Sequence, residues 1–137
     1  MARIHLQVVS ADRSLVNEQV DEVEIPGADG YFGVLPGHTP LLALLGAGEL
    51  WYRQGQEIHY VYLAMGFGEI QPDRVTILAE SAERADEIDL ARAQAAKTRA
   101  EERLARPTVD IDAERARIAL LKSLIRIQVA SRVKIRS

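Results

Sequence analysis

Residues 73–97, DRVTILAESAERADEIDLARAQAAK, contain the change of pattern that decides the fold. The first part, DRVTILAE, alternates apolar and polar side chains at the period of two that is typical of a half-buried β-strand. From Asp86 onward the chain has no glycine and is dense in Ala, Arg, Glu, Leu and Ile, which are mostly good helix formers. The sequence therefore predicts a β domain that ends near residue 84 and a helical segment after it.

Short alternating runs separated by turn residues fill residues 1–84. Runs such as IHLQVV, QVDEVEIPG and EIHYVYLAMG place apolar residues at or near every second position. The stripes that they form contain Val20, Val23, Ile25, Leu50, Tyr52, Ile58, Tyr60 and Tyr62. Turn stretches such as PGADG, PGHTP, RQGQ and QPD recur roughly every ten residues, which is typical of an antiparallel sandwich or barrel. We predict an antiparallel β-sandwich over residues 1–84.

A hairpin of two antiparallel helices is predicted for residues 87–134. Pro107 interrupts the helical composition, and the short link RPTVD around it makes the two helices neighbours. Asp86 or Asp89 is expected to cap the first helix, because a carboxylate accepts hydrogen bonds from the unpaired amides of the first turn. Asp110 or Asp112 is expected to cap the second helix in the same way. The predicted fold class is α+β.

Both predicted helices carry apolar and cationic stripes at helical spacing. On the second helix the apolar stripe consists of Ile118, Leu121, Ile125 and Val129, and the adjacent cationic one of Arg115, Lys122 and Arg126. On the first helix the cationic stripe consists of Arg92, Arg99 and Arg103. If the apolar stripes pack together, the cationic faces converge in one groove. The other interpretation is that each is the solvated face of an amphipathic helix, and the angles alone leave both open.

The two halves of the chain differ in charge. Residues 1–84 carry 5 Arg against 12 Asp and Glu, a net charge of −7. Residues 85–137 carry 12 Lys and Arg against 8 Asp and Glu, a net charge of +4, and the two values give the total of −3. This asymmetry indicates a helical segment that meets an anionic partner.

Composition excludes several classes of protein. Cysteine is absent, which excludes a disulfide framework and thiolate metal sites. The most apolar run, PLLALLGAG at 40–48, is far shorter than the roughly 20 residues that span a bilayer, so we expect no membrane insertion.

The stretch GYFGVLPGHTPLL, residues 30–42, is the best candidate for a functional loop in the β domain. Its glycines and prolines give the backbone a sharp and rigid path around His38. A rigid, partly apolar loop of this kind indicates a docking surface. We therefore interpret His38 as an interface residue and not as a catalyst.

Two other classes of function remain as alternatives. A free-standing metal-dependent enzyme on a cupin-like barrel would use His38, His59 and Glu49, although no H-x-H or H-x-x-x-H spacing occurs. Neither a G-x-x-x-x-G-K-[ST] phosphate loop nor a G-x-S-x-G nucleophile elbow occurs. A nucleic-acid-binding module would use the basic helical segment, which has no aromatic residue to stack on bases and a net charge of only +4. We expect no nucleic-acid partner.

Two long stretches carry a resemblance to a known family. Residues 27–50, GADGYFGVLPGHTPLLALLGAGEL, and residues 62–93, YLAMGFGEIQPDRVTILAESAERADEIDLARA, closely resemble the epsilon subunits of F-type ATP synthases. The resemblance spans essentially the whole chain, including the two-helix tail. It implies a non-catalytic subunit in the rotating central stalk of a proton-translocating synthase, held peripherally at the cytoplasmic face of the bacterial plasma membrane.

The resemblance also implies partners and residue roles. The sandwich would bind the gamma subunit and the ring of c subunits, with His38 in the gamma contact and Tyr31 at the loop tip that meets the c ring. The helical tail would either fold on the sandwich or extend toward the alpha and beta subunits, where it restrains ATP hydrolysis.

A second motif, EIDLARA, implies that ATP binds as a regulatory ligand. We expect no required cofactor. The family pattern I/L-D-x-x-R-A is matched by Ile88, Asp89, Arg92 and Ala93. By the same resemblance Glu83 helps to hold the adenine or its surroundings, and Arg99 and Arg126 approach the phosphates. Lys122 belongs to the same predicted site. Position 122 is lysine, whereas the family members that bind nucleotide most strongly have arginine there. Lysine keeps the positive charge but lacks the fork of donors by which arginine makes two hydrogen bonds at once. ATP that binds only the closed hairpin would shift the tail away from its extended form.

Overall fold

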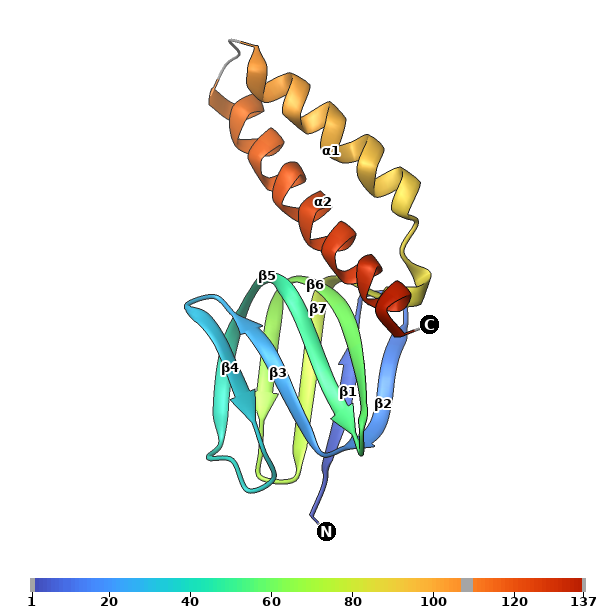
Figure 1. Cartoon of the computed structure of the whole chain (residues 1–137). Helices are drawn as coiled ribbons and strands as arrows, with labels where there is room; N and C mark the ends of the chain where they lie inside the picture. The colour runs from blue at the N-terminus through green and yellow to red at the C-terminus, as the bar shows by residue number, and fades with distance from the viewer. Residues whose placement is uncertain (1, 107–109, 137) are drawn as a thin grey trace. The chain divides into compact units, whose positions relative to one another are not determined.

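A computed structural model describes residues 2–106 and 110–136 of the chain. The chain divides into two compact units, Met1–Arg84 and Ala85–Ser137. The first unit contains strands only and the second contains helices only (Figure 1). The predicted α+β class, with a β-sandwich followed by a helical hairpin, is confirmed.

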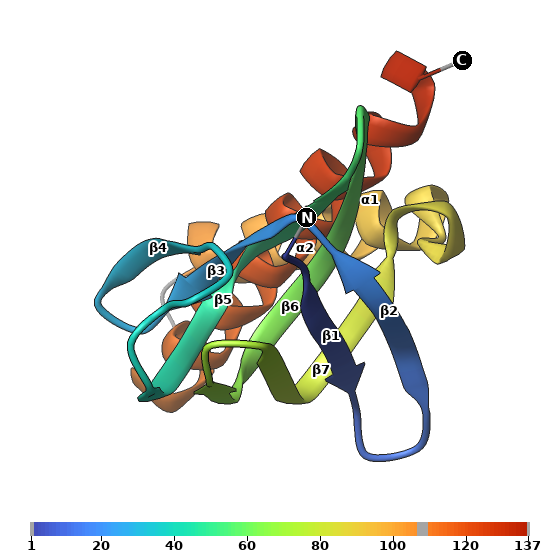
Figure 2. The ribbon, with the colours of Figure 1, turned by 90° about the horizontal axis from the view of Figure 1, so that it is seen from below.

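The β unit is built from seven strands in the order β2-β1-β7-β6-β5-β3-β4. Their bounds are β1 Ile4–Val9, β2 Ser14–Val20, β3 Glu22–Gly27, β4 Gly30–Val34, β5 Leu41–Gln54, β6 Glu57–Ile70 and β7 Arg74–Arg84. All neighbouring strands are antiparallel except β1 and β7, which pair in parallel from His5↔Arg74 to Val9↔Leu78. Figure 2 shows the sheet running from β4 at one side to β2 at the other. The expectation of a purely antiparallel domain is therefore wrong for this one pair.

Edge strand β2 is also joined to β5, although the two are not neighbours in the strand order. The Gln54 side-chain amide donates to the backbone oxygen of Gln19 at 3.0 Å. The backbone N–H of Asp21, in the link between β2 and β3, donates to the Arg53 oxygen of β5 at 2.8 Å. These bonds curl the sheet into a sandwich and occupy polar groups that an open edge would leave unpaired.

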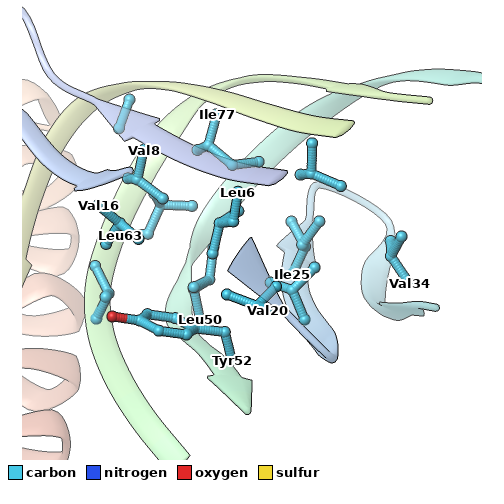
Figure 3. Close-up of a cluster of buried hydrophobic side chains, with 14 of the residues drawn as sticks. Leu6, Val8, Val16, Val20, Ile25, Val34, Leu50, Tyr52, Leu63 and Ile77 are labelled. Carbon is cyan, nitrogen blue, oxygen red and sulfur yellow. The ribbon is translucent and has the colours of Figure 1, made fainter. Parts of the chain in front are cut away.

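One apolar core fills the sandwich. Leu6 and Val8 on β1 meet Leu50, Leu63 and Ile77 from three other strands (Figure 3), and all five are fully buried. Burial of side chains of this size stabilises a fold by about 1.5–3 kcal/mol each, which makes the cluster the main source of stability in this unit.

The three long strands reverse their faces at one level of the sheet. On β5, Leu45 lies in the core before this level in the sequence and Leu50 lies in the core after it. The buried positions therefore change from odd to even residue numbers. The same change separates Ala79 from Ala82 on β7. The ladders skip Gly46, Met65 and Glu80, which lie at this level on β5, β6 and β7. Met65 has φ of 62°, a left-handed conformation that is rare for a residue with a side chain.

This reversal changes the assignment of one predicted stripe. Ile58, Tyr60 and Tyr62 occupy alternate positions on β6, and the core residues of this strand are Val61 and Leu63. Adjacent residues of a strand point to opposite faces. The predicted stripe therefore lies on the face of β6 that does not carry the core.

The helical unit contains a short 3-10 turn η1 (Ala85–Glu87) followed by α1 (Leu90–Ala105) and α2 (Asp110–Arg136). Asp89 caps α1, since its carboxylate accepts the backbone N–H of Arg92 at 3.0 Å. Of the two predicted caps, Asp89 is therefore correct and Asp86 lies in η1. Pro107 falls outside the described residues. The two residues predicted to cap the second helix, Asp110 and Asp112, both lie within α2 and not before it, because the helix already begins at Asp110.

Helices α1 and α2 lie side by side and antiparallel (Figure 1). The side chains buried in this unit are mostly small. Ala93 and Ala100 are buried on α1, and Ala116 and Ser123 on α2, each pair seven residues apart. The Ser123 hydroxyl donates to the Ala119 oxygen at 2.7 Å, which satisfies the polar group in this interface. Seven residues are about two helical turns, so each pair lies on one face.

The predicted apolar stripe of α2 is wrong at two of its four positions. Ile118 is 41% exposed and Leu121 is 47% exposed, whereas Val129 is buried and Ile125 half-buried. The physical reason is that small residues allow the two helix backbones to approach closely, so alanine and serine occupy the contact instead of the larger apolar residues.

Candidate functional site

The EIDLARA motif lies at the start of α1. Besides its side-chain cap, Asp89 accepts the Ala93 backbone N–H through its main-chain oxygen at 3.0 Å. Ala93 is buried, Arg92 is exposed, and Ile88 is half-buried between η1 and the cap. The motif thus uses aspartate to begin the helix and alanine to permit close packing, and it leaves Arg92 available to a ligand.

A pocket of about 110 Å³ lies between the two helices. It is lined by Ala96, Arg99, Ala100, Arg103, Ala116 and Ala119. The alanines leave space because they are short, and the two arginines supply positive charge beside an otherwise apolar lining. Arg92 lies seven residues before Arg99 and therefore on the same face of α1.

Lys122 and Arg126 project from α2 on the same side as this pocket. Lys122 follows Ala119 by three residues and Arg126 follows Lys122 by four, so the three residues form one stripe, and Ala119 lines the pocket together with Arg99. Both cationic side chains are half-buried. Since η1 also contacts α2, the motif end of α1 lies beside α2. The helical unit thus brings Arg92, Arg99, Lys122 and Arg126 to one side of the hairpin.

Two other arginines define the limits of this cationic surface. Arg103 lines the pocket and was left out of the predicted ligand set, although its spacing of four from Arg99 is a signal that the sequence contains. Arg117 is exposed and forms an ion pair with Glu114 at 2.7 Å. Arg117 therefore serves as a matched cation outside the site.

Glu83 lies in the other unit, near the end of β7. It is half-buried and pairs across the strands with Tyr62 of β6, which in turn pairs with Glu49 of β5. The three residues form a cross-strand row on one face of the sheet.

Several cations on one side of two packed helices suit a polyphosphate. Arginine side chains donate fork-shaped pairs of hydrogen bonds to phosphate oxygens, and these charge-assisted bonds are stronger than neutral ones. A ligand that contacts both helices would hold the hairpin closed.

Tyr31 lies in β4, immediately after the β3–β4 turn. Its side chain is 56% exposed, and its hydroxyl accepts the Glu49 backbone N–H at 2.9 Å. The ring lies so close to Gly48 that a Cβ at this glycine would collide with the Tyr31 hydroxyl. Tyr31 thus attaches the hairpin to β5 while more than half of the residue stays exposed.

His38 lies in the connection between β4 and β5. Its Nδ1 is 2.6 Å from the Thr39 backbone oxygen, a contact in which Nδ1 carries the proton and donates. The loop is held to the β6–β7 turn by a bond from the Gly37 N–H to the Pro72 oxygen at 2.7 Å. Gly37 has φ of 88°, which glycine adopts without strain. The sharp turn predicted for this loop is present.

The residues named for a metal-dependent enzyme have other contacts. His59 stacks on Tyr52 with ring centroids 5.0 Å apart and lies 3.5 Å from the Glu57 carboxylate. Across the described part of the chain, no group of three or more His, Cys, Asp or Glu side chains is arranged to hold a metal ion.

A row of exposed apolar side chains crosses three strands. Leu44, Phe67 and Leu78 pair with one another across β5, β6 and β7, and their exposed fractions are 62%, 54% and 54%. Leu42 lies two residues before Leu44 on the same face and is 74% exposed. Sequence reasoning missed this row because it depends on the face reversal at Gly46, Met65 and Glu80.

Both units match one family of known proteins. The profile described as "ATP synthase, Delta/Epsilon chain, beta-sandwich domain" matches residues 3–85, and the profile "ATP synthase, Delta/Epsilon chain, long alpha-helix domain" matches residues 86–131. The chain belongs to the ATP synthase delta/epsilon chain family.

Individual relatives agree with the family assignment. The ATP synthase epsilon chain of Nitratidesulfovibrio vulgaris is 47% identical over 126 residues, which are 92% of this chain and 94% of the relative. ATP synthase epsilon chain 2 of Syntrophotalea carbinolica is 46% identical over 131 residues, 95% of each chain. The resemblance to epsilon subunits stated from the sequence is therefore confirmed.

The fold also occurs in a solved assembly. A chain in the structure of the Euglena gracilis mitochondrial ATP synthase OSCP/F1/c-ring matches with a TM-score of 0.70 at 22% identity, covering 99% of this chain and 82% of the other. Over the described residues, neither α1 nor α2 has a stretch apolar and long enough to cross a membrane.

Proposed function

We propose that this member of the epsilon family is a non-catalytic subunit in the central stalk of a proton-translocating ATP synthase, at the cytoplasmic face of the bacterial plasma membrane. The observation that carries the proposal is the match of both units, over 3–85 and 86–131, to the two domains of the family. The β unit docks on the gamma subunit and the c ring, near His38 and Tyr31. The helical unit contacts the alpha and beta subunits when it extends.

Regulatory ATP binding is the second part of the proposal. It is supported by the cationic surface formed by Arg92, Arg99, Lys122 and Arg126 beside the Asp89 cap. ATP held there joins α1 to α2 and favours the closed hairpin, since a ligand shifts an equilibrium toward the state that it binds better. Low ATP would then release the tail, which restrains hydrolysis by the alpha and beta subunits.

Co-purification tests the proposed place in the complex. A tagged copy of the chain, expressed in its native host and isolated from detergent-solubilised membranes, is expected to bring alpha, beta and gamma subunits with it in fixed ratio. A chain that elutes alone, or with stoichiometric bound metal, would contradict the proposal and favour the enzyme alternative.

A further inference from the structure

Ser123 is a polar side chain buried in the helical unit, and the proposed function gives it no role. It is 1% exposed, and the residues buried with it, Ala93, Ala100 and Ala116, are apolar. We propose that the buried hydroxyl of Ser123 lowers the stability of the closed hairpin and thereby sets the ATP concentration at which the tail closes. This inference rests on the proposed function, because it concerns the closed form that ATP would bind.

The spacing of the buried residues places Ser123 between the two helices. Ala116 lines the interhelical pocket together with Ala100, so these two residues lie on the faces that meet. Ser123 follows Ala116 by seven residues, about two helical turns, and therefore lies on the same face of α2. Ala93 precedes Ala100 by the same interval on α1. Since the helices are antiparallel (Figure 1), Ser123 and Ala93 lie at the same level of the hairpin.

The hydroxyl of Ser123 forms its hydrogen bond within α2. It donates to the backbone oxygen of Ala119, one turn earlier, at 2.7 Å. This bond does not require α1, so it contributes nothing specific to the closed hairpin. Burial against α1 removes the hydroxyl from water, which costs free energy that the burial of an alanine methyl group does not cost. The closed hairpin is therefore less stable with serine at position 123 than it would be with alanine.

Ser123 lies beside the cations of the proposed ATP site. Lys122 precedes it directly, and Arg126 follows it by three residues, about one turn. The site takes cations from both helices, with Arg92 on α1 and Arg126 on α2, so it is complete only when the helices are packed together. A binding form that is only fractionally populated lowers the apparent affinity for the ligand by that fraction. By lowering the population of the closed form, Ser123 raises the ATP concentration that is needed to close the tail.

Ser123→Ala tests the inference in the full chain. The change removes the buried hydroxyl and keeps a small side chain, so the apparent affinity for ATP should increase about threefold or more. A serine that simply stabilised the hairpin would give the opposite sign. Ser131→Ala is the matched control for the higher helix propensity of alanine, because Ser131 is exposed and also bonds within α2, to the Gln128 oxygen at 2.6 Å. Calorimetric titration with ATP measures the affinity of both variants and of wild type.

Energy transfer between the helices measures the population of the closed form without ATP. The chain has no cysteine, so Ala95→Cys on α1 and Leu121→Cys on α2, both at exposed positions, accept a donor and an acceptor label. Ser123→Ala should increase the transfer, and Ser131→Ala should leave it unchanged. Ser123→Leu should decrease it, because leucine is too large for a contact between closely packed helices.

Two results would overturn the inference. In the first, Ser123→Ala and Ser131→Ala give the same energy transfer and the same ATP affinity as wild type, so the closed form does not depend on the hydroxyl. In the second, Ser123→Ala binds ATP more weakly than wild type, so the hydroxyl supports the closed form. Absence of saturable ATP binding by wild type would instead contradict the proposed regulation by ATP, and the energy transfer without ATP would still decide the role of Ser123.

Discussion

Arginine at positions 92 and 126 is the residue-scale basis of the proposed ATP site. Each charge-assisted hydrogen bond contributes about 1.5–3 kcal/mol, so Arg92→Ala or Arg126→Ala should weaken ATP binding roughly tenfold or more. Arg117→Ala is the control, since Arg117 is exposed and paired with Glu114. Calorimetric titration with ATP and with ADP measures the affinity of each variant and of wild type. Wild type should bind ATP more tightly than ADP. Equal losses for Arg92 and Arg117, or no saturable signal at millimolar ATP, would leave these arginines as a surface for the catalytic subunits.

Lys122 offers the opposite test, a gain of affinity. Arginine carries a rigid fork of donors, while lysine is a single charge on a flexible stem. Lys122→Arg should therefore tighten ATP binding in the same titration. If affinity is unchanged or reduced, the side chain at 122 does not reach the phosphates.

Asp21 gives the β unit a pH-dependent contribution to stability. Its carboxylate accepts the Gly55 backbone N–H at 2.6 Å and the Arg3 guanidinium at 3.1 Å. These two hydrogen bonds hold the pKa of Asp21 below its ordinary value of 3.8, and the bond from Gly55 has the larger effect. Because the pKa is lowered in the folded state, the contribution is complete above pH 3.8 and is lost as the pH falls through the folded-state pKa.

The matching variant is Asp21→Asn. At pH 7 it should melt at a lower temperature than wild type, and the difference should shrink as the pH is lowered below about 4. Thermal unfolding followed by circular dichroism over this range measures the effect. A difference in melting temperature that is independent of pH would show that the carboxylate charge does not contribute.

At the scale of the element, β6 depends on Gly66 at its face reversal. Gly66 has φ of 135°, and a Cβ there would collide with the Leu78 carbonyl oxygen. Gly66→Ala should therefore lower the free energy of unfolding by more than about 2 kcal/mol, since strain and steric overlap act together. Gly55→Ala is the control: its φ is 62° with open space around the Cβ, so it should cost only about 1 kcal/mol. Urea denaturation compares them, and equal costs would contradict the close approach of β6 and β7.

The presence of the strands and helices could be predicted from the sequence. Which face of each element is buried could be predicted only in part. Alternation in residues 1–84 and the glycine-free segment after Asp86 predicted the two kinds of structure. Period-two reasoning assumes that a strand keeps one face throughout, and the reversal at Met65 breaks this assumption. On α2 the largest apolar residues suggested the contact, whereas packing selected Ala116 and Ser123 because they are small.

The start of α1 was predictable where a motif fixed it. The pattern I/L-D-x-x-R-A located Asp89 and Arg92, and the structure adds the helix cap that explains the aspartate. The role of Arg103 in the pocket depends on which side of α1 faces Ala116 and Ala119, and this is set by packing between the helices. The exposed row around Phe67 depends on the pairing of three strands, which no local pattern specifies.

At the scale of the whole molecule, the two compact units suggest separate tasks. The core of the β unit is formed by strand residues, from Ile4 to Ala82, and contains none from the helices. We therefore expect the β unit to fold without residues 87–137 and to support ATP synthesis. Failure of the truncated chain to fold would contradict the separation of the two tasks.

The central claim is that the helical unit restrains ATP hydrolysis. The most direct measurement compares the steady-state hydrolysis rate of two assembled synthases, one with the full chain and one with a chain lacking residues 87–137. We predict a higher rate for the complex with the truncated subunit at low ATP, and a smaller difference at ATP concentrations that saturate the Arg92 and Arg126 site and hold the hairpin closed. Equal rates for the two complexes at every ATP concentration, with the truncated subunit fully incorporated, would contradict the account.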